Sequence, residues 1–271
     1  MSAASFAKQY GPWAVVAGAS SGLGAEFARQ LAGRGLNVLL LARRRTLTEE
    51  LARQIATEFK VEARAAEVDL ASPELLAQLR AATTGLDVGL FVYNAAQSLI
   101  GPFMEQPLAD KLRIVDVNCR GPLIFADELG KKMLARGRGG IVIMASLAAA
   151  QGSPLVATYA ASKAFDLVLA EGLWDELGRH GVDVIACRAG ATRTPNYEAA
   201  RPAGKVPIME SAPVVRATLD QLGHAPSFVP GFVNQLVSHV FGRILSRRTT
   251  IRIMGNATRK LYPDRAGNAK A

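Results

Sequence analysis

The sequence predicts one α/β domain of the doubly wound type, in which a parallel sheet carries helices on both faces. Short apolar runs alternate with helical segments along most of the chain, and a glycine-rich segment follows the first apolar run. Parallel strands need a long crossover between them, usually a helix, so this alternation is typical of a parallel sheet. The 271 residues fit a single domain spanning 1–271, and no repeat or linker divides them.

Composition and charge narrow the function classes. The chain is 49% apolar, yet no apolar run reaches the ~20 residues of a membrane helix and the N-terminus lacks a signal pattern, so we expect a cytoplasmic protein. Cys119 and Cys187 are isolated and lack metal-ligand spacing, which indicates free thiols and no metal site. The net charge of +9 is dispersed except at 43–45 and near the C-terminus, so we expect no nucleic-acid partner.

The elements follow in chain order from apolar runs and helical segments. After a leader of residues 1–12, strands are predicted at Trp13–Ala17, Leu36–Leu41, Val61–Ala66, Asp87–Tyr93, Ile141–Ala145 and Val182–Cys187. Helices are predicted from the glycine-rich segment to Arg34, at about Thr46–Phe59, from Pro107 to a break near Gly121–Pro122, and from about Val156 to Leu177. This order gives one helix or polar loop after each strand.

The glycine-rich segment has the context of a phosphate-binding loop. It lies between a predicted strand and a predicted helix, and it contains Gly18, Ser20, Ser21, Gly22, Leu23 and Gly24. Glycines permit a tight turn and a close approach of the backbone, and the start of the helix offers N–H groups to a pyrophosphate. An ordinary strand-to-helix turn is the alternative. The flanking elements favour dinucleotide binding, and therefore a Rossmann fold.

Basic residues follow the second strand, where an acidic residue would accept the ribose hydroxyls of NAD. This chain has Arg43, Arg44 and Arg45 there, and guanidinium groups bind phosphate through paired hydrogen bonds. The run indicates NADP(H) with its 2′-phosphate, although a solvated basic loop has the same sequence. Asp69, followed by Leu70, comes soon after the third strand and is positioned to accept from the adenine amino group.

A hydroxyl, a phenol and an ammonium converge after the fifth strand. Tyr159 and Lys163 lie four residues apart in a predicted helix, so their side chains point from the same face. Ser146 comes directly after the strand Ile141–Ala145. A phenol is a poor base at neutral pH, and a nearby cation lowers the pKa of a phenol. The three groups suit proton transfer to or from an alcohol; a tyrosine and a lysine on a helix surface are the alternative.

With these segments in order, the chain resembles the short-chain dehydrogenase/reductase family from about Trp13 to Val229. The matching pieces are Gly18-x-x-x-Gly22-x-Gly24, Asp69, Asn94-Ala95, Asn118, Ser146 and Tyr159-x-x-x-Lys163. The resemblance implies a seven-stranded parallel sheet, a homodimer or homotetramer, and cofactor contacts from Asn94, Ala95, Gly190, Thr192 and Thr194. The segments Tyr10–Ser20 and Val229–Gly231 also resemble the branch of hydroxysteroid dehydrogenases and long-chain 3-oxoacyl reductases.

The resemblance implies a role for each member of the catalytic set. Tyr159 exchanges a proton with the substrate oxygen as general acid or base, and Ser146 hydrogen-bonds the same oxygen. Lys163 holds the nicotinamide ribose, and Asn118 holds a water that relays protons from Lys163. The activity expected is NADP(H)-dependent interconversion of a ketone and a secondary alcohol.

Three positions depart from the family pattern beside the cofactor. Ala17 stands where the family usually has Thr, Ala96 where it has Gly, and Ala189 where it has Pro. None of these changes removes a reacting group. They keep open a second hypothesis, in which the chain is a non-catalytic NADP(H)-binding regulatory protein.

Three segments are expected around the substrate, and no charged cluster facing Tyr159 can be identified in the lid. They are Gln97–Met104, Ala148–Leu155 and a mobile lid at about 192–211. Ala, Gly and Pro dominate the second segment, which predicts an apolar, fairly open slot. A hydrophobic substrate is expected: a steroid, a long-chain 3-oxoacyl thioester or an aryl ketone. Arg193 and Arg201 in the lid are placed to receive the phosphate of a thioester carrier.

An amphipathic helix is predicted at about 232–247. Its apolar residues recur at helical intervals: Val233, Leu236, Val237, Val240, Phe241, Ile244 and Leu245. Arginines follow at Arg243, Arg247, Arg248 and Arg252. One interpretation is that the helix packs on the lid or on a subunit partner. The other is peripheral contact with an anionic membrane surface.

Overall fold

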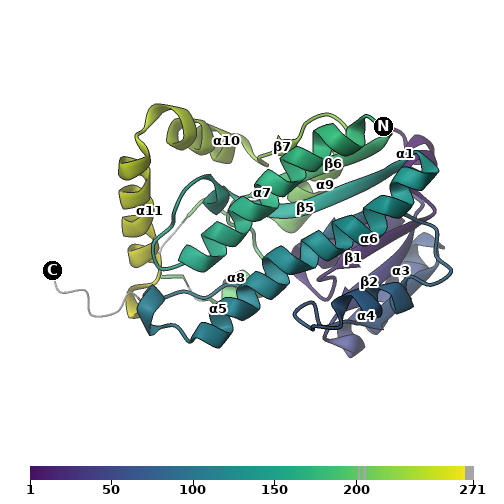
Figure 1. Ribbon diagram of the computed structural model, residues 1–271, viewed down its shortest axis with the longest axis horizontal. Coiled ribbons are helices and arrows are strands. Elements are labelled where there is room, and N and C mark those ends of the chain that lie inside the picture. Colours follow the sequence, from purple (N-terminus) through teal and green to yellow (C-terminus); the bar gives the residue numbers. More distant parts are fainter. Residues whose placement is uncertain (201, 204–205, 266–271) are drawn as a thin grey trace.

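Seven parallel strands form the centre of the molecule, as the resemblance implied (Figure 1). The structure is a computed structural model that describes residues 1–200, 202–203 and 206–265. Its strands are β1 (Trp13–Ala17), β2 (Asn37–Ala42), β3 (Ala63–Glu67), β4 (Val88–Tyr93), β5 (Gly139–Ser146), β6 (Val182–Ala189) and β7 (Ser227–Phe228). Their order is β3-β2-β1-β4-β5-β6-β7. The order reverses between β1 and β4, and ligands of such sheets bind beyond the strand ends at that point.

Two helical layers cover the sheet, and each buries its own apolar core. One layer consists of α1 (Ala3–Tyr10), α2 (Gly22–Ala32), α3 (Arg45–Phe59) and α9 (Ser211–Gln221). The other consists of α4 (Leu75–Ala82), α6 (Gly121–Arg136) and α7 (Ala157–Gly178). Strand side chains alternate between the layers, so that Val16 packs in the first core while Val15 and Ala17 pack in the second. The predicted doubly wound architecture is confirmed.

The long helix before β5 does not break where a break was predicted. α5 (Leu108–Val115) continues through a π-helical turn (Asp116–Arg120) into α6, so the Gly-Pro pair lies in the first turn of α6. Because the helix is continuous here, Pro122 removes one N–H from its hydrogen-bond ladder, and the wider π-helical turn precedes that position. Tyr93 packs at this turn and donates from its hydroxyl to the Val117 carbonyl at 2.6 Å. A Cβ on Gly121 would collide with that hydroxyl, which explains the glycine.

Helices form in several places where none was predicted, among them α8 (Pro195–Ala199) in the expected lid and α9 directly after it. The leader contains α1, which is held on the sheet by its buried Phe6 and Tyr10. α4 follows β3 directly, and α11 (Arg247–Leu261) occupies most of the C-terminal part of the described chain. Three 3₁₀ turns complete the set, at Phe103–Glu105, Leu147–Ala150 and Pro263–Arg265.

The C-terminal amphipathic helix ends earlier than predicted. α10 (Phe232–His239) is followed by a π-helical turn (Val240–Ile244), and the backbone is extended at Leu245. Ser246 then caps α11 by accepting from the Thr249 N–H at 3.2 Å. The helix predicted over 232–247 is therefore wrong at its end, because a serine cap starts a new helix there. No helix in the described ranges combines the length and apolar character that crossing a membrane requires.

Candidate functional site

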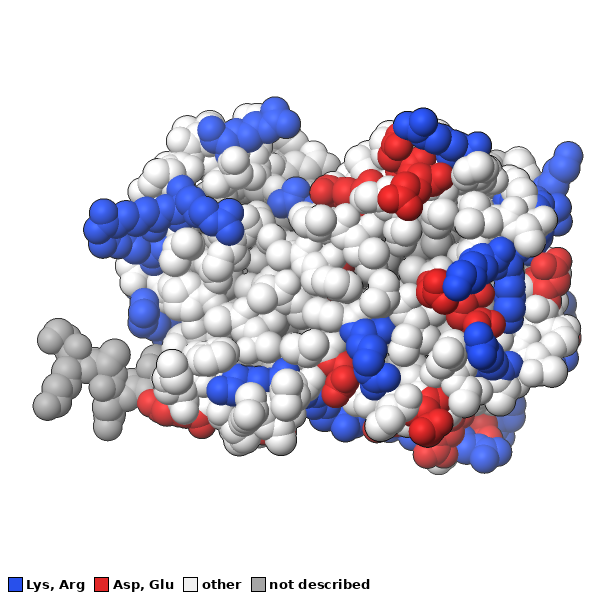
Figure 2. Space-filling model, in the orientation of Figure 1, with Lys and Arg blue, Asp and Glu red and all other residues white. Residues whose placement is uncertain are grey.

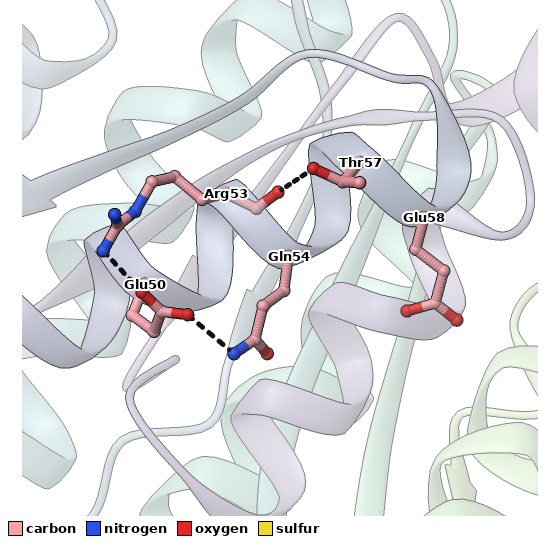
Figure 3. Close-up of a pocket in the computed structure, with 5 residues that line it drawn as sticks. All are labelled: Glu50, Arg53, Gln54, Thr57 and Glu58. Carbon is pink, nitrogen blue, oxygen red and sulfur yellow. Dashed lines mark hydrogen bonds and ion pairs between the residues drawn. The ribbon is translucent and has the colours of Figure 1, made fainter.

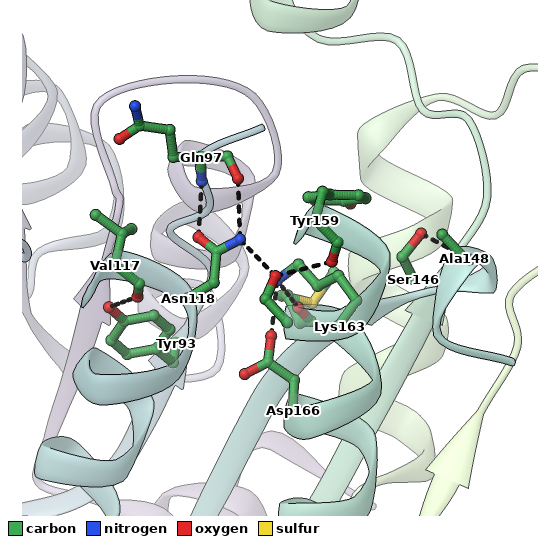
Figure 4. A network of polar contacts seen from close by, with 11 residues as sticks. Tyr93, Gln97, Val117, Asn118, Ser146, Ala148, Tyr159, Lys163 and Asp166 are labelled. Carbon is green, nitrogen blue, oxygen red and sulfur yellow. Dashed lines mark hydrogen bonds and ion pairs between the residues drawn. The ribbon is translucent and has the colours of Figure 1, made fainter. Parts of the chain in front are cut away.

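The four predicted catalytic residues gather at the carboxyl edge of the sheet (Figure 4). Ser146 ends β5, while Tyr159 and Lys163 lie on the first turns of α7, which leads from β5 to β6. Asn118 lies in the π-helical turn before α6. The crossover from β5 to β6 therefore places Tyr159 and Lys163 beside Ser146.

Ser146 and Tyr159 present hydroxyl groups at this edge. Ser146 Oγ accepts from the Ala148 N–H at 3.2 Å, which leaves its own proton to donate. Tyr159 is half-buried, and Lys163 Nζ lies 5.9 Å from the centre of its ring. Two hydroxyl donors beside a cation suit an oxygen that gains negative charge during a reaction.

Lys163 is buried, and its charge is compensated on the inner side of α7. Nζ donates to the Met144 carbonyl at 2.6 Å and to Asp166 Oδ2 at 2.9 Å (Figure 4). Burial alone would lower the pKa of Lys163, but the Asp166 carboxylate and the Tyr159 side chain outweigh burial and hold that pKa above its ordinary value. An ammonium has three N–H groups, and these two contacts leave one for a ligand.

The amide of Asn118 is fully engaged with the protein. Nδ2 donates to the Gln97 carbonyl and to Ser162 Oγ, both at 2.9 Å, and Oδ1 accepts from the Gln97 N–H at 2.8 Å. Ser162 donates in turn to the Tyr159 carbonyl at 2.8 Å. These bonds fix the loop after β4 against α7. None of them reaches Lys163, and the water relay between Asn118 and Lys163 stays a prediction.

The glycine loop and the turn after β4 are tied together by direct contacts. Asn94 Nδ2 donates to the Gly18 carbonyl at 3.1 Å, and the Ala17 carbonyl accepts from the N–H groups of Asn94 and Ala95 at 3.1 and 3.0 Å. Gly18 has a φ of +81°, and a Cβ on Gly24 would collide with the Gly18 carbonyl. The hydroxyl that the family usually has in place of the Ala17 methyl is therefore not needed to hold these two segments.

Arg44 lies over the glycine loop. Its Nη2 donates to Ser20 Oγ at 2.7 Å and to Ser21 Oγ at 3.0 Å. Arg43 is exposed beside it, whereas Arg45 turns to Glu49 on α3 at 2.7 Å. A guanidinium with two hydroxyls, next to a glycine loop and the start of α2, is a donor set that suits phosphate. These residues fit a phosphorylated dinucleotide.

Asp69 and Leu70 are more engaged with the protein than the sequence suggested. Asp69 accepts from the Ala71 N–H at 3.1 Å and from Arg113 Nη2 at 3.1 Å. Burial acts to raise the pKa of Asp69, but these two donors outweigh burial, and the pKa lies below its ordinary range. Leu70 is a buried core residue, so only its backbone is open to a ligand. The adenine contact of Asp69 stays a prediction.

The predicted lid is anchored at both ends. Thr192 pairs with Met209 in a β-bridge, and the Arg193 N–H donates to the Met209 carbonyl at 2.8 Å. Thr194 caps α8 (Pro195–Ala199), and its methyl lies where a Cβ on Gly22 would be. The start of the lid therefore touches the glycine loop.

The other predicted contacts on this side of the site stay predictions. Arg193 forms an exposed pair with Glu210 at 2.8 Å, and Arg201 lies outside the described residues. Gly190 approaches α10, because its Cβ would meet the amide of Asn234. The turn after β6 is therefore packed against the C-terminal region.

The slot expected at Ala148–Leu155 is covered by α11. A Cβ on Gly255 would meet Pro154, and a Cβ on Gly152 would contact Ile251. Gln151, the long polar side chain of this segment, is buried. The slot is thus less open than predicted, because the sequence analysis did not recognise α11.

Two surface grooves lie outside the catalytic cluster. One, of about 400 Å³, runs along α3, where Glu50 pairs with Arg53 and accepts from Gln54 at 2.9 Å (Figure 3). The other, of about 540 Å³, lies between β6, β7 and α10 and includes Arg188 and Arg243. Neither groove contains a predicted site residue.

Three partners of the predicted site residues were missed. Asp166 pairs with Lys163, Ser162 accepts from the amide of Asn118, and Arg113 pairs with Asp69. The spacing of Lys163 and Asp166, three positions apart on a helix, was a signal that sequence reasoning had available. The other two partners come from separate elements, and only the fold brings them together.

Comparisons with known proteins identify the family to which this chain is similar. A model of the short chain dehydrogenase family matches residues 12–204. The 7beta-hydroxysteroid dehydrogenase of Clostridium sardiniense is 31% identical over 233 residues, which is 85% of this chain and 89% of that protein. The very-long-chain 3-oxoacyl-CoA reductase of Phaeosphaeria nodorum is 33% identical over 221 residues, or 79% of this chain. The matched region spans only 64% of that reductase.

Solved structures give the same picture. A structure from work on 7beta-hydroxysteroid dehydrogenase stereoselectivity aligns with a TM-score of 0.87 at 27% identity and covers 92% of this chain and 98% of that one. A short-chain dehydrogenase from Sphingobium yanoikuyae, solved in complex with NADPH, aligns with a TM-score of 0.75 at 29% identity and covers 81% of this chain and 86% of that one. The similarity to the first structure extends over most of the chain.

Proposed function

This chain belongs to the short chain dehydrogenase family, and we propose that it is an NADP(H)-dependent oxidoreductase that interconverts a hydrophobic ketone and a secondary alcohol. The observation that carries the proposal is the cluster of Ser146, Tyr159 and Lys163 at the carboxyl end of β5, with the glycine loop at the same edge of the sheet after β1, on the other side of β4. A cytoplasmic location is part of the proposal.

The chemistry assigned to the chain is proton transfer. NADP(H), when bound, supplies the hydride for reduction or accepts it for oxidation. In reduction, Tyr159 gives its phenol proton to the substrate oxygen, and the Ser146 hydroxyl donates a hydrogen bond to the same atom. The Lys163 cation favours the phenolate that Tyr159 becomes. In oxidation, the phenolate takes the proton back.

The cofactor is assigned to the loops beyond β1, β2, β4 and β6. The residues that would hold it are Gly18, Ser20, Ser21, Gly22, Leu23, Gly24, Arg43, Arg44, Asp69, Leu70, Asn94, Ala95, Tyr159, Lys163, Gly190, Thr192 and Thr194. The preference for NADP(H) over NAD(H) rests on Arg44, whose contacts with two serine hydroxyls hold a cation over the loop. The solved relative that contains NADPH supports the same choice.

The substrate proposed is large and apolar. The segment 148–150 is all Ala, and α11 closes over Gly152 and Pro154 with Ile251 and Gly255. The names of the relatives indicate steroids and long-chain 3-oxoacyl thioesters, and an aryl ketone is the third class considered. Arg193 is paired with Glu210, so a thioester carrier has less to bind in the lid than the sequence suggested.

A tyrosine-to-phenylalanine pair tests the proposal. Tyr159→Phe keeps the ring and removes the proton, so NADPH binding is expected to persist while ketone reduction falls by roughly 10²–10⁴-fold. Tyr10→Phe is the matched control, because the Tyr10 hydroxyl donates to Asp183, the second residue of β6, and takes no part in the site. Undiminished reduction by Tyr159→Phe contradicts the proposal.

The second candidate is a non-catalytic NADP(H)-binding regulatory protein. Ala17, Ala96 and Ala189 motivate it. The backbone contacts of Ala17 weaken this candidate, since they hold the glycine loop without a side-chain hydroxyl. Cofactor binding without NADPH oxidation across a broad carbonyl panel would favour it.

The C-terminal helices carry a surface that suits an anionic membrane. This basic–apolar surface consists of Phe232, Val233, Leu236, Arg243, Arg247, Arg248 and Arg252, and all seven side chains are exposed. Figure 2 shows basic side chains gathered over the α10–α11 end of the molecule. Segment 232–265 holds seven basic residues and one acidic residue. Exposed apolar side chains surrounded by cations are typical of peripheral membrane helices, and repulsion between like charges disfavours pairing of this surface with its own copy.

A homodimer or homotetramer is proposed through another part of the chain. α6 and α7, which belong to the same helical layer as α4, expose Leu123, Val168 and Trp174. Exposed apolar side chains on neighbouring helices suit a subunit interface. Light scattering coupled to gel filtration distinguishes these assemblies from a monomer.

A further inference from the structure

A buried acid faces the proposed catalytic lysine. Asp166 is 1% exposed and Lys163 is 2% exposed, and the two are joined at 2.9 Å between Oδ2 and Nζ. Oδ1 of Asp166 is also buried and has no hydrogen-bond partner among the described residues. Of the ion pairs in that part of the chain, this pair is the one with both side chains almost fully buried.

The surroundings of Asp166 hold one close cation. Lys163 is that cation, and it lies on the same helix. Tyr93 on β4 and Cys119 in the π-helical turn face the pair as neutral groups, and burial raises the pKa of both beyond their ordinary values. Arg120 in the same turn is directed to the carbonyls of residues 71 and 72 instead. The carboxylate therefore acts mainly on Lys163.

We propose that Asp166 is a positioning residue of this site, which fixes the Lys163 ammonium and offsets part of its charge, and so sets the pH range in which Tyr159 exchanges its proton. This inference rests on the proposed function, in which Lys163 acts on Tyr159. The ammonium favours the phenolate form of Tyr159, and a negative charge on the far side of the ammonium opposes that effect. Nζ lies 2.9 Å from Asp166 Oδ2 and 5.9 Å from the centre of the Tyr159 ring, and at the effective dielectric of a protein a charge at such a separation shifts a pH dependence by on the order of one unit.

The pH profile of alcohol oxidation tests this role. Oxidation needs a proton acceptor for the alcohol, so its rate is expected to rise with pH along an acid limb. Asp166→Asn removes the charge and keeps an oxygen that can accept from Lys163. The acid limb is then expected to move to lower pH by about one unit. A limb that stays in place or moves to higher pH overturns the proposal.

Two comparisons separate this role from a structural one. Asp175→Asn is the matched control, because Asp175 lies on the same helix in an exposed pair with Arg179 at 2.8 Å. The acid limb of the oxidation profile should not move in this variant. In a Lys163→Met background, burial favours the uncharged form of Asp166 because its partner cation is gone, so Asp166→Asn should cause no further shift. A further shift in that background means that Asp166 does not act through Lys163.

A stability cycle keeps the inference testable if the neutral variant does not fold. Replacing both partners, as in Lys163→Met with Asp166→Leu, leaves no buried charge unpaired, so this variant should melt at a higher temperature than Asp166→Leu alone. Equal melting temperatures overturn the proposal. A wild-type protein without oxidoreductase activity contradicts the proposed function and removes the ground for this inference, whereas an active protein with an unmoved limb contradicts the role of Asp166 alone.

Discussion

Helix α7 buries charged side chains, whereas the C-terminal pair α10–α11 exposes them. α7 buries Lys163 against Asp166 inside the protein. α10 instead exposes Phe232, which is 80% accessible, and α11 exposes Arg247 and Arg248. A buried pair depends on one geometry, because neither partner can turn to water. Exposed charges act together and are screened by salt, so no single one is essential.

The two regions are therefore expected to differ in how much a single side chain matters. On α7, one substitution is expected to change both stability and chemistry. On the basic–apolar surface, the effect of each residue is expected to be small and roughly additive. The predictions below test this difference, beginning with the largest expected effect.

The largest effect on stability is expected from breaking the buried pair on α7. Asp166→Ala leaves the Lys163 ammonium buried without its partner, which costs about 3–5 kcal/mol in the free energy of unfolding. Asp175→Ala on the same helix breaks an exposed pair with Arg179 and should cost well under ~1 kcal/mol. Urea denaturation of both variants measures the difference. Equal losses would remove the distinction between buried and exposed charge on this helix.

Arg44 is an intermediate case, since it is exposed yet held by two serine hydroxyls. Arg44→Ala should weaken NADPH binding by about 1.5–3 kcal/mol, the value of a charged hydrogen bond, and leave NADH binding nearly unchanged. Arg45→Ala is the control, because Arg45 pairs with Glu49 on α3. Fluorescence titration with both cofactors gives the affinities. Tighter binding of NADH than of NADPH by the wild-type protein would contradict the assignment.

The basic–apolar surface is expected to bind vesicles that contain anionic lipid. Each basic residue near such a surface contributes about 1 kcal/mol, so Arg247→Glu with Arg248→Glu should reduce co-sedimentation strongly, and added salt should do the same. Phe232→Ser should reduce it less. Arg53→Glu on the outer face of α3 serves as the control.

Two results would contradict this interpretation of the surface. One is the absence of binding to anionic vesicles at low salt. The other is a concentration-dependent dimer that Phe232→Ser dissociates, which would make α10 an interface between copies of the chain.

The last prediction concerns two cysteine thiols, that of Cys119, which is partly exposed, and that of Cys187, which is buried. Burial raises the pKa of Cys119 to about 11 and that of Cys187 to about 12. Because only the thiolate reacts, both should resist iodoacetamide at pH 8 in the folded protein and react on unfolding, at least about 100-fold faster. Their reactivity should rise only toward high pH. Rapid labelling of folded protein at pH 8 would mean that the interior beside α7 is open to solvent.

The sequence sufficed for the parts of the site that depend on local pattern. The glycine loop, Ser146, Tyr159 and Lys163 follow strands and helices whose apolar periodicity is clear, and the fold brings them to one edge. The parallel sheet with helices on both faces could be predicted from the alternation of strands and helices together with the family resemblance, whereas the order of its strands was not predicted.

What the sequence did not reveal depends on contacts between distant elements. α11 is much more polar than α10, with basic and hydroxyl residues between its few apolar ones, so its helical character was missed. The π-helical turn was taken for a break, because the space that Tyr93 fills is visible only in three dimensions. Arg113 and Asp69 pair across 44 positions, which no local pattern predicts.

The measurement that tests the central claim most directly is ketone reduction by the purified protein with NADPH. A panel of matched steroid, aryl and long-chain 3-oxoacyl substrates, together with small sugars, would be followed by NADPH oxidation and by detection of the alcohol product. The account predicts that at least one bulky apolar ketone is reduced, with one alcohol formed for each NADPH oxidised, and that Tyr159→Phe abolishes most of this turnover. Binding of NADPH without oxidation by any member of the panel, or activity confined to the sugars, would contradict it.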